Sequence, residues 1–132
     1  MTAGTGREPA TPCAGPGRRF AAALGAALCA IAVGLGAYAA HAASDTARTR
    51  LDTAVLYLFL HGLALAVFAL RQRGWLSAAS LILWIAGCAG FCGSLVAAAL
   101  WGAPTMFAPV GGIAFMLGWL LQAVVLGRAP AR

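Results

Sequence analysis

The amino-acid sequence predicts an all-α fold: an integral membrane four-helix bundle, with the N-terminus and the C-terminus both in the cytoplasm. Three observations predict it: an apolar composition, four apolar runs of membrane-spanning length, and an uneven distribution of arginine. Of the 132 residues, 62% are hydrophobic and 9% are charged, whereas an average soluble domain is about 45–50% apolar and about 25% charged. A soluble chain this short could not hide so much apolar surface, since small domains bury only about 60–70% of the surface that the unfolded chain exposes. The length allows one domain.

The first apolar run follows a tail, residues 1–19, that is rich in Gly, Pro, Thr and Ala. The tail has no periodic apolar pattern to offset its ordering entropy, so we expect it to be disordered. Residues 20–43 then make a helix of roughly 36 Å, enough to cross a hydrocarbon core of about 30 Å. Arg18 and Arg19 before this run also resemble a twin-arginine leader, with residues 40–42 as a cleavage site. A signal h-region is only ~7–15 residues long, and more apolar runs follow, so we expect the segment to remain as a helix.

Three further apolar runs follow. A polar turn at residues 44–52 leads to the second run, 53–70, which only His61 interrupts and which a basic turn at 71–74 ends. The stretch beyond it, up to residue 127, is too long for one crossing. Its strongest breaker is the WGAPT sequence at 101–105, and Gly with Pro favours a turn. We therefore predict helices at 76–100 and 106–126, and a short cytoplasmic tail at 128–132.

The orientation follows from arginine, because the chain contains no Lys. In a four-helix topology, Arg48 and Arg50 lie on one side, and the other side carries Arg7, Arg18, Arg19, Arg71, Arg73, Arg128 and Arg132. The positive-inside rule places the side with seven arginines in the cytoplasm. A net charge of +6 also invites a nucleic-acid interpretation, but that needs a basic face interleaved with aromatic side chains. Here the arginines form short clusters between apolar runs, so we expect no nucleic acid as a partner.

Small residues predict how the helices pack. Helices in lipid gain little hydrophobic energy from each other and associate where small side chains let backbones approach. Gly25, Cys29 and Val33 share a stripe on the first helix. The third and fourth helices carry the remaining predicted packing positions, Gly87, Gly90, Gly93, Ser94, Gly111, Gly112 and Gly118. The pattern predicts a compact bundle without a wide aqueous pore.

Polar side chains inside the membrane are the candidate functional residues, because each charge there costs about 2.5–3.5 kcal/mol on insertion scales. Thr53, Tyr57 and His61 form one stripe on the second helix, and Tyr38 and His41 form another on the first. We expect these two stripes to face each other in a small, outward-open polar cleft. A structural role, in which interhelical hydrogen bonds contribute about 0.6 kcal/mol each, is favoured for both histidines. The alternative is a pocket in which neutral His61 accepts or relays a proton.

Cofactor and metal chemistry have little support in the sequence. Cys88 and Cys92 are four residues apart, which is not the spacing of a CxxC redox motif, and a buried Cys usually behaves as a small hydrophobe. Ligation of haem by two histidines also has little support, because His41 and His61 lie at different depths and the sequence has no second pair of histidines. Proton-coupled export, as in small multidrug transporters, needs a buried carboxylate, whereas Asp45 and Asp52 lie at the loop. We expect no catalytic residue, no metal and no cofactor.

Four blocks of sequence resemble a known family: GLGAYAAHA at 34–42, LDTAVLYLFLHGLALAVFAL at 51–70, AGCAGFCGSLVAAAL at 86–100 and APVGGIAFMLGWLLQA at 108–123. Over residues 24–126 the chain is similar to domain of unknown function 423, bacterial inner-membrane proteins related to eukaryotic transmembrane protein 256. The resemblance implies four helices in a bacterial inner (plasma) membrane and no established activity. Leu58, Cys92 and Val96 stand where Gln, Ser and Tyr are usual, so the cleft is less polar than the resemblance implies.

Three functional hypotheses follow. The favoured one is a non-enzymatic membrane component that packs in the lipid bilayer with partner membrane proteins or with copies of itself, or that associates with lipid and senses it. The second is a carrier of small solutes or ions that uses the cleft at Tyr57 and His61. The third is a redox or quinone-associated subunit.

Overall fold

The computed structural model describes residues 14–128. Within them, four helices are long and apolar enough to cross a membrane: Pro16–His41, Asp45–Arg71, Trp75–Trp101 and Ala108–Gly127. They are roughly 30–40 Å long at about 1.5 Å per residue. The predicted all-α, four-span fold is confirmed. Most of the predicted disordered tail and the last four residues lie outside the described part of the chain.

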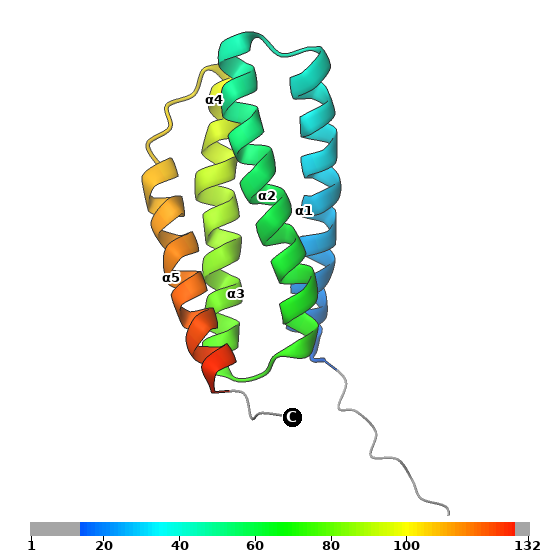
Figure 1. Ribbon diagram of the computed structural model, residues 1–132, viewed down its shortest axis with the longest axis vertical. Coiled ribbons are helices and arrows are strands. Elements are labelled where there is room, and N and C mark those ends of the chain that lie inside the picture. The colour runs from blue at the N-terminus through cyan, green and yellow to red at the C-terminus, as the bar shows by residue number, and fades with distance from the viewer. Residues whose placement is uncertain (1–13, 129–132) are drawn as a thin grey trace, which may run out of the picture.

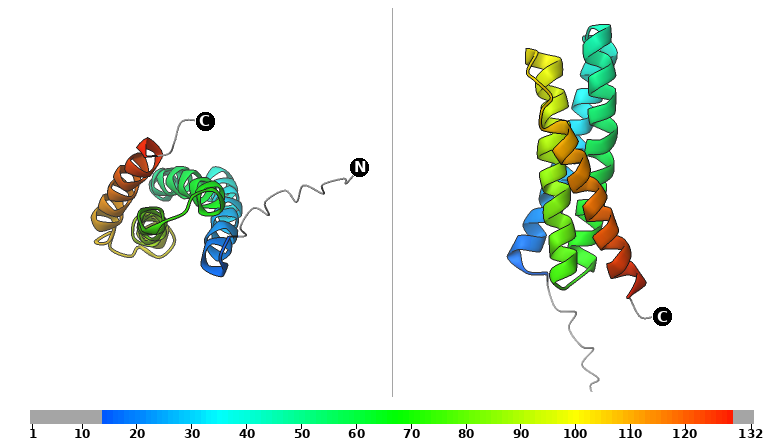
Figure 2. Two further views of the ribbon diagram at one scale, coloured as in Figure 1. Left: turned by 90° about the horizontal axis from the view of Figure 1, so that it is seen from below. Right: turned by 90° about the vertical axis from the view of Figure 1, so that its left-hand side faces the viewer.

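The four spans run alternately up and down (Figure 1). The first two are α1 (Pro16–His41) and α2 (Asp45–Arg71). The third comprises α3 (Trp75–Gly87), a π-helical turn η1 (Cys88–Cys92) and α4 (Gly93–Trp101), and the fourth is α5 (Ala108–Gly127). Seen from below, α1 and α5 lie on opposite sides of the central pair formed by α2 and the third span (Figure 2). The start of α1, the α2–α3 turn and the end of α5 therefore share one end of the bundle.

The start of α1 corrects the predicted tail, because the helix begins at Pro16 instead of residue 20. Proline suits a first helical position, since its φ angle is already helical and its missing N–H would have no intrahelical partner there. The amides of Arg18 and Arg19 both donate to the Gly15 carbonyl, at 3.0 and 3.1 Å. This early start places the Arg18 side chain on a helix and against the rest of the bundle.

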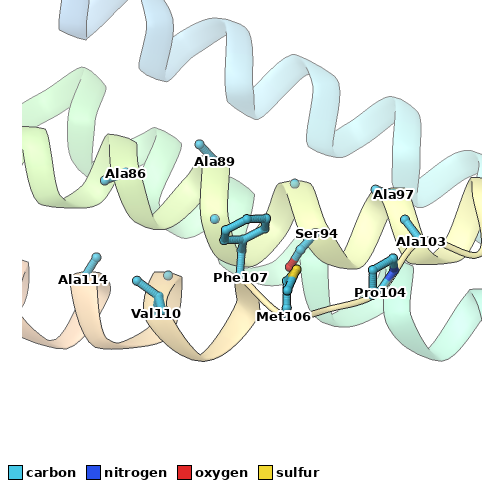
Figure 3. Close-up of a pocket in the computed structure, with 13 residues that line it drawn as sticks. Ala86, Ala89, Ser94, Ala97, Ala103, Pro104, Met106, Phe107, Val110 and Ala114 are labelled. Atoms are coloured by element: carbon cyan, nitrogen blue, oxygen red, sulfur yellow. The ribbon is translucent and has the colours of Figure 1, made fainter.

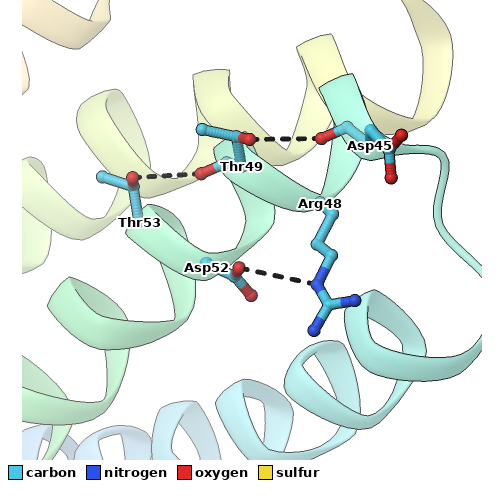
Figure 4. Close-up of polar contacts among 5 residues, drawn as sticks. All are labelled: Asp45, Arg48, Thr49, Asp52 and Thr53. Atoms are coloured by element: carbon cyan, nitrogen blue, oxygen red, sulfur yellow. Dashed lines mark hydrogen bonds and ion pairs between the residues drawn. The ribbon is translucent and has the colours of Figure 1, made fainter.

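The start of α2 corrects the predicted polar turn, because residues 45–52 are helical. Thr49 donates its hydroxyl to the Asp45 carbonyl and Thr53 donates to the Thr49 carbonyl, each at 3.1 Å (Figure 4). Arg48 and Asp52 form an exposed i,i+4 ion pair at 3.9 Å, and Asp45 lies in the first turn, where a negative charge is favourable. Polar side chains bonded within their own helix thus extend α2 beyond its apolar run.

The third span continues through η1 and ends at Gly102, whose φ of 66° is a left-handed helix cap. The connection to α5 then includes Pro104, as the breaker sequence predicts. The bounds of α5 lie close to the predicted 106–126. The sequence does not predict the π turn, because residues 88–92 are as apolar as the rest of the span and no breaker marks the change in hydrogen bonding.

Glycines lie at both major helix contacts. A Cβ on Gly62 would sit 2.8 Å from the Gly25 carbonyl oxygen of α1, and a Cβ on Gly111 would sit 2.8 Å from the Phe91 Cα. Of the predicted packing set, Gly87, Gly90, Gly111 and Gly118 lie at such contacts. Gly93 and Gly112 do not, since the nearest atoms to an added Cβ are at 3.8 Å. Ser94 is buried, and its hydroxyl donates to the Phe91 carbonyl of its own span.

Candidate functional site

An aromatic cluster surrounds His61, which is 4% exposed. The imidazole stacks on Phe115 of α5, with ring centroids 3.6 Å apart. Trp84 of α3 and Trp119 of α5 present their rings at steep angles, with centroids 6.3 and 6.0 Å away. Tyr57, one turn earlier on α2, lies parallel to the imidazole at 6.0 Å. The cluster therefore joins three of the four spans.

Both ring nitrogens of His61 have partners. Nδ1 lies 2.8 Å from the Tyr57 carbonyl oxygen, and the Trp119 indole donates to Nε2 at 3.0 Å. A carbonyl oxygen only accepts and an indole N–H only donates, so this network assigns the proton to Nδ1 and a lone pair to Nε2. An imidazolium would direct an Nε2–H at the indole N–H. The geometry thus fits a neutral imidazole.

Beside the cluster lies a groove of about 810 Å³ between α2 and α5, lined by Tyr57, His61 and Trp119. Its outer wall includes Ile113, Met116 and Leu120, which are 53%, 63% and 66% exposed. The groove therefore opens at the side of the bundle, where lipid would lie, and not at one end. Its lining is almost wholly apolar apart from His61, the Tyr57 hydroxyl and the Trp119 indole.

The structure does not bring the five residues of the predicted cleft together. Tyr57 and His61 contact rings of η1, α3 and α5, whereas Tyr38 and His41 lie exposed on α1. Thr53 is half-buried and bonded to its own helix. The prediction that the stripes of α1 and α2 face each other is wrong for His61. The helix contact at Gly62 turns that side of α2 toward α1, and one residue rotates the direction by about 100°, so His61 faces α5.

A second groove, of about 570 Å³, lies between the third span and the start of α5 (Figure 3). Small side chains such as Ala86, Ala89 and Ala97 line one wall, with Phe107 and Val110 opposite. The only polar side chain in this lining is Ser94, whose hydroxyl is already bonded to the Phe91 carbonyl. The groove offers shape and apolar contact without reactive groups.

A polar network that the sequence does not predict lies at the arginine-rich end of the bundle. Gln122 of α5 is fully buried. Its amide donates to the Gln72 side-chain oxygen at 2.6 Å and its own oxygen accepts from the Ser80 hydroxyl at 3.0 Å. The sequence indicates this network only through Gln122, a single amide side chain within an apolar run. Gln122 ties α5 to both α3 and the α2–α3 turn.

Arg18 connects α1 to the end of α2 and to the α2–α3 turn through hydrogen bonds. Its guanidinium donates to the carbonyls of Gln72, Ala69 (3.4 Å) and Gly74 (3.1 Å), and to the Ser77 hydroxyl at 3.3 Å. The last carbonyls of a helix have no intrahelical partner, and a cation is favourable at a helix C-terminus. Arg18 therefore caps α2 from a neighbouring helix.

The cysteines of the described residues are free thiols. Cys88 and Cys92 are buried, and Cys29 lies with its sulfur 3.6 Å from the Phe59 carbonyl oxygen at the α1–α2 contact. Over residues 14–128, no group of three or more His, Cys, Asp or Glu side chains is placed to hold a metal ion. Cys13 lies outside the described residues.

The family described as "Protein of unknown function (DUF423)" matches residues 35–112, which include Tyr57, His61 and Phe91. A UPF0382 membrane protein of Haemophilus influenzae is 34% identical over 97 residues, which cover 67% of this chain and 77% of that protein. No solved structure matches the chain.

Proposed function

This chain belongs to the DUF423 family, and from that premise we propose that it is a non-enzymatic, multi-pass component of the bacterial inner membrane. It acts by packing in the bilayer with partner membrane proteins or with copies of itself. Four apolar spans and a relative named as a membrane protein support the membrane location. The observation that carries the non-enzymatic role is the complete hydrogen bonding of His61.

The chemistry of His61 supports this role. A general base or proton relay must exchange a proton with a substrate or a mobile water. Here Nδ1 is bonded to the Tyr57 carbonyl and Nε2 to the Trp119 indole. Both partners are fixed parts of the fold, so the imidazole serves as a polar joint between α2 and α5.

Two variants of His61 distinguish a packing role from a role in proton transfer or ligand binding. His61→Phe keeps an aromatic ring to stack on Phe115, whereas His61→Ala removes it. We expect His61→Ala to lower the midpoint of thermal unfolding far more than His61→Phe, and native mass spectrometry to show the same assembly for His61→Phe as for the wild type. A small bound molecule that both variants lose equally would contradict the packing role, because the imidazole itself would then be required.

We also propose that both termini face the cytoplasm. The end of the bundle with the α2–α3 turn carries Arg18, Arg19, Arg71, Arg73 and Arg128, and the other end carries Arg48 and Arg50. This asymmetry supports the orientation through the positive-inside rule. A green fluorescent protein fused to the C-terminus should fluoresce, and alkaline phosphatase fused there should be inactive. The reverse pair of results would overturn the orientation.

A second candidate is a carrier for a small solute or ion, which the 810 Å³ groove beside Tyr57 and His61 favours. Transport would require His61 to release Trp119 as the solute passes. In proteoliposomes, uptake should then be lost in His61→Ala and kept in Cys88→Ala. Equal uptake in wild type and His61→Ala would remove this candidate.

A further inference from the structure

A pocket of about 390 Å³ lies at the arginine-rich end of the bundle, where the α2–α3 turn meets the end of α5. Three arginines line it: Arg71 from the end of α2, Arg73 from the turn and Arg128 from the end of α5. Arg71 and Arg73 are neighbours in the chain, and the folded bundle brings Arg128 to them. We call this site the arginine pocket.

The charged side chains that the structure describes at this end of the bundle are all arginines. Within residues 14–128 the carboxylates are Asp45 and Asp52, both near the start of α2. Asp52 lies roughly 28 Å along the helix from Arg71, far beyond the screening length of about 8 Å at physiological ionic strength. The described side chains therefore give the pocket a positive charge, which is complementary to an anion.

The apolar walls narrow the class of anion. Leu76, Val125 and Leu126 line the pocket beside the arginines, and Leu126 is 51% exposed. Trp75 lies at the rim and is 77% exposed, a position typical of the aromatic side chains that anchor a helix at the headgroup level. A ligand that fits both parts has an anionic head for the guanidinium groups and an acyl chain that continues along the leucines.

We propose that the arginine pocket binds the phosphate headgroup of an anionic phospholipid. Guanidinium groups pair with phosphate through two parallel hydrogen bonds and lose little hydration in doing so. Basic pockets between membrane helices are suited to such headgroups. The site does not depend on the direction in which the chain crosses the membrane, nor on the proposed packing role of His61.

The test is a lipid titration of the full-length protein, released from detergent and weighed by native mass spectrometry. The probes are phosphatidylglycerol and phosphatidylcholine with identical acyl chains. We expect tighter binding of phosphatidylglycerol, and about a fivefold weaker affinity for it in each of Arg71→Gln and Arg128→Gln, because each substitution removes a hydrogen bond to the headgroup that contributes about 1 kcal/mol. Millimolar inorganic phosphate, which offers the same head without acyl chains, should leave the lipid bound.

Arg19→Gln is the matched control, because Arg19 is exposed at the same end of the bundle but does not line the pocket. It removes the same charge and should leave lipid affinity within twofold of the wild type. Three results would each overturn the proposal: equal binding of the two lipids, an equal loss in Arg19→Gln, or displacement of the lipid by inorganic phosphate. The last would assign the pocket to a soluble anion. Thermal unfolding of each variant checks that the bundle is intact.

Discussion

The two outer helices are held to the central pair by glycine in two different ways. At the α1–α2 contact, Gly25 and Gly62 bring backbone against backbone, and a Cβ on Gly25 would sit 2.6 Å from the Ala66 amide nitrogen. At the contact of α5 with the third span, glycine also makes room for rings. A Cβ on Gly118 would sit 2.6 Å from Trp84 Cδ1, and one on Gly87 would sit 2.6 Å from Phe115 Cε1.

One residue type thus supports two kinds of packing, which differ in how well they tolerate an added methyl group. A clash with backbone can be relieved only if the helices separate. A clash with a ring can be relieved if that side chain is replaced by a smaller one. Gly25 should therefore tolerate an added methyl group less well than Gly87 or Gly118.

The largest effect is expected for Gly25→Ala. The added methyl meets the Gly62 carbonyl and the Ala66 amide, so α1 and α2 must move apart, at a cost of about 1–3 kcal/mol or more. The thermal unfolding midpoint in detergent should fall sharply. Gly34→Ala is the control on the same helix, because no atom lies within 4 Å of its added Cβ. Similar midpoints for the two variants would refute the backbone contact.

The next effect is expected for Gly118→Ala, at about 1–3 kcal/mol, and here a second substitution should relieve the clash. Trp84→Leu removes the rigid indole, together with an Nε1–H that is buried without a hydrogen-bond partner in the described structure. A double-mutant cycle should show that Gly118→Ala costs less in the Trp84→Leu background, with a coupling of about 0.5–3 kcal/mol. Strict additivity would show that the two side chains do not compete for space.

The same comparison explains what the sequence could and could not predict. The lengths of the apolar runs predict the four spans. The spacing of glycines predicts the close helix contacts at Gly87, Gly90, Gly111 and Gly118. The neighbours of His61 depend on which face of α2 meets α1. Gly62 determines that face, because it contacts Gly25 of α1. A single glycine in an apolar run does not show which helix it will contact. The helical start at Asp45 was missed because its stabilising bonds lie between polar side chains and their own backbone.

The polar network shows the same limit at the arginine-rich end. A buried amide in an apolar run signals a partner, but Gln72 and Gln122 are fifty residues apart, and nothing in their spacing pairs them. Arg18 counted only as a topology signal, whereas the structure shows that it caps α2. Long-range pairs of this kind follow from the packing of whole helices and not from local sequence.

A smaller effect is expected for Gln122→Leu, which breaks the tie between α5 and the central pair while it preserves volume. Without Gln122, the single proton of the Ser80 hydroxyl can be donated to the Ser77 carbonyl at 2.9 Å instead, so the loss is limited to about 1 kcal/mol, typical of one or two neutral hydrogen bonds. Hydrogen exchange should increase at the end of α5 and not in α1. Equal exchange in both helices would show that Gln122 does not act on α5 alone.

The smallest effect is expected for Trp119→Phe, which removes the indole donor to His61 Nε2 but keeps an aromatic ring beside Trp84. Hydrogen bonds between membrane helices contribute about 0.6 kcal/mol on average. The unfolding midpoint should therefore fall only slightly, well below the change for Gly118→Ala. A loss as large as that of Gly25→Ala would mean that the bond to His61, and not glycine packing, holds α5 in place.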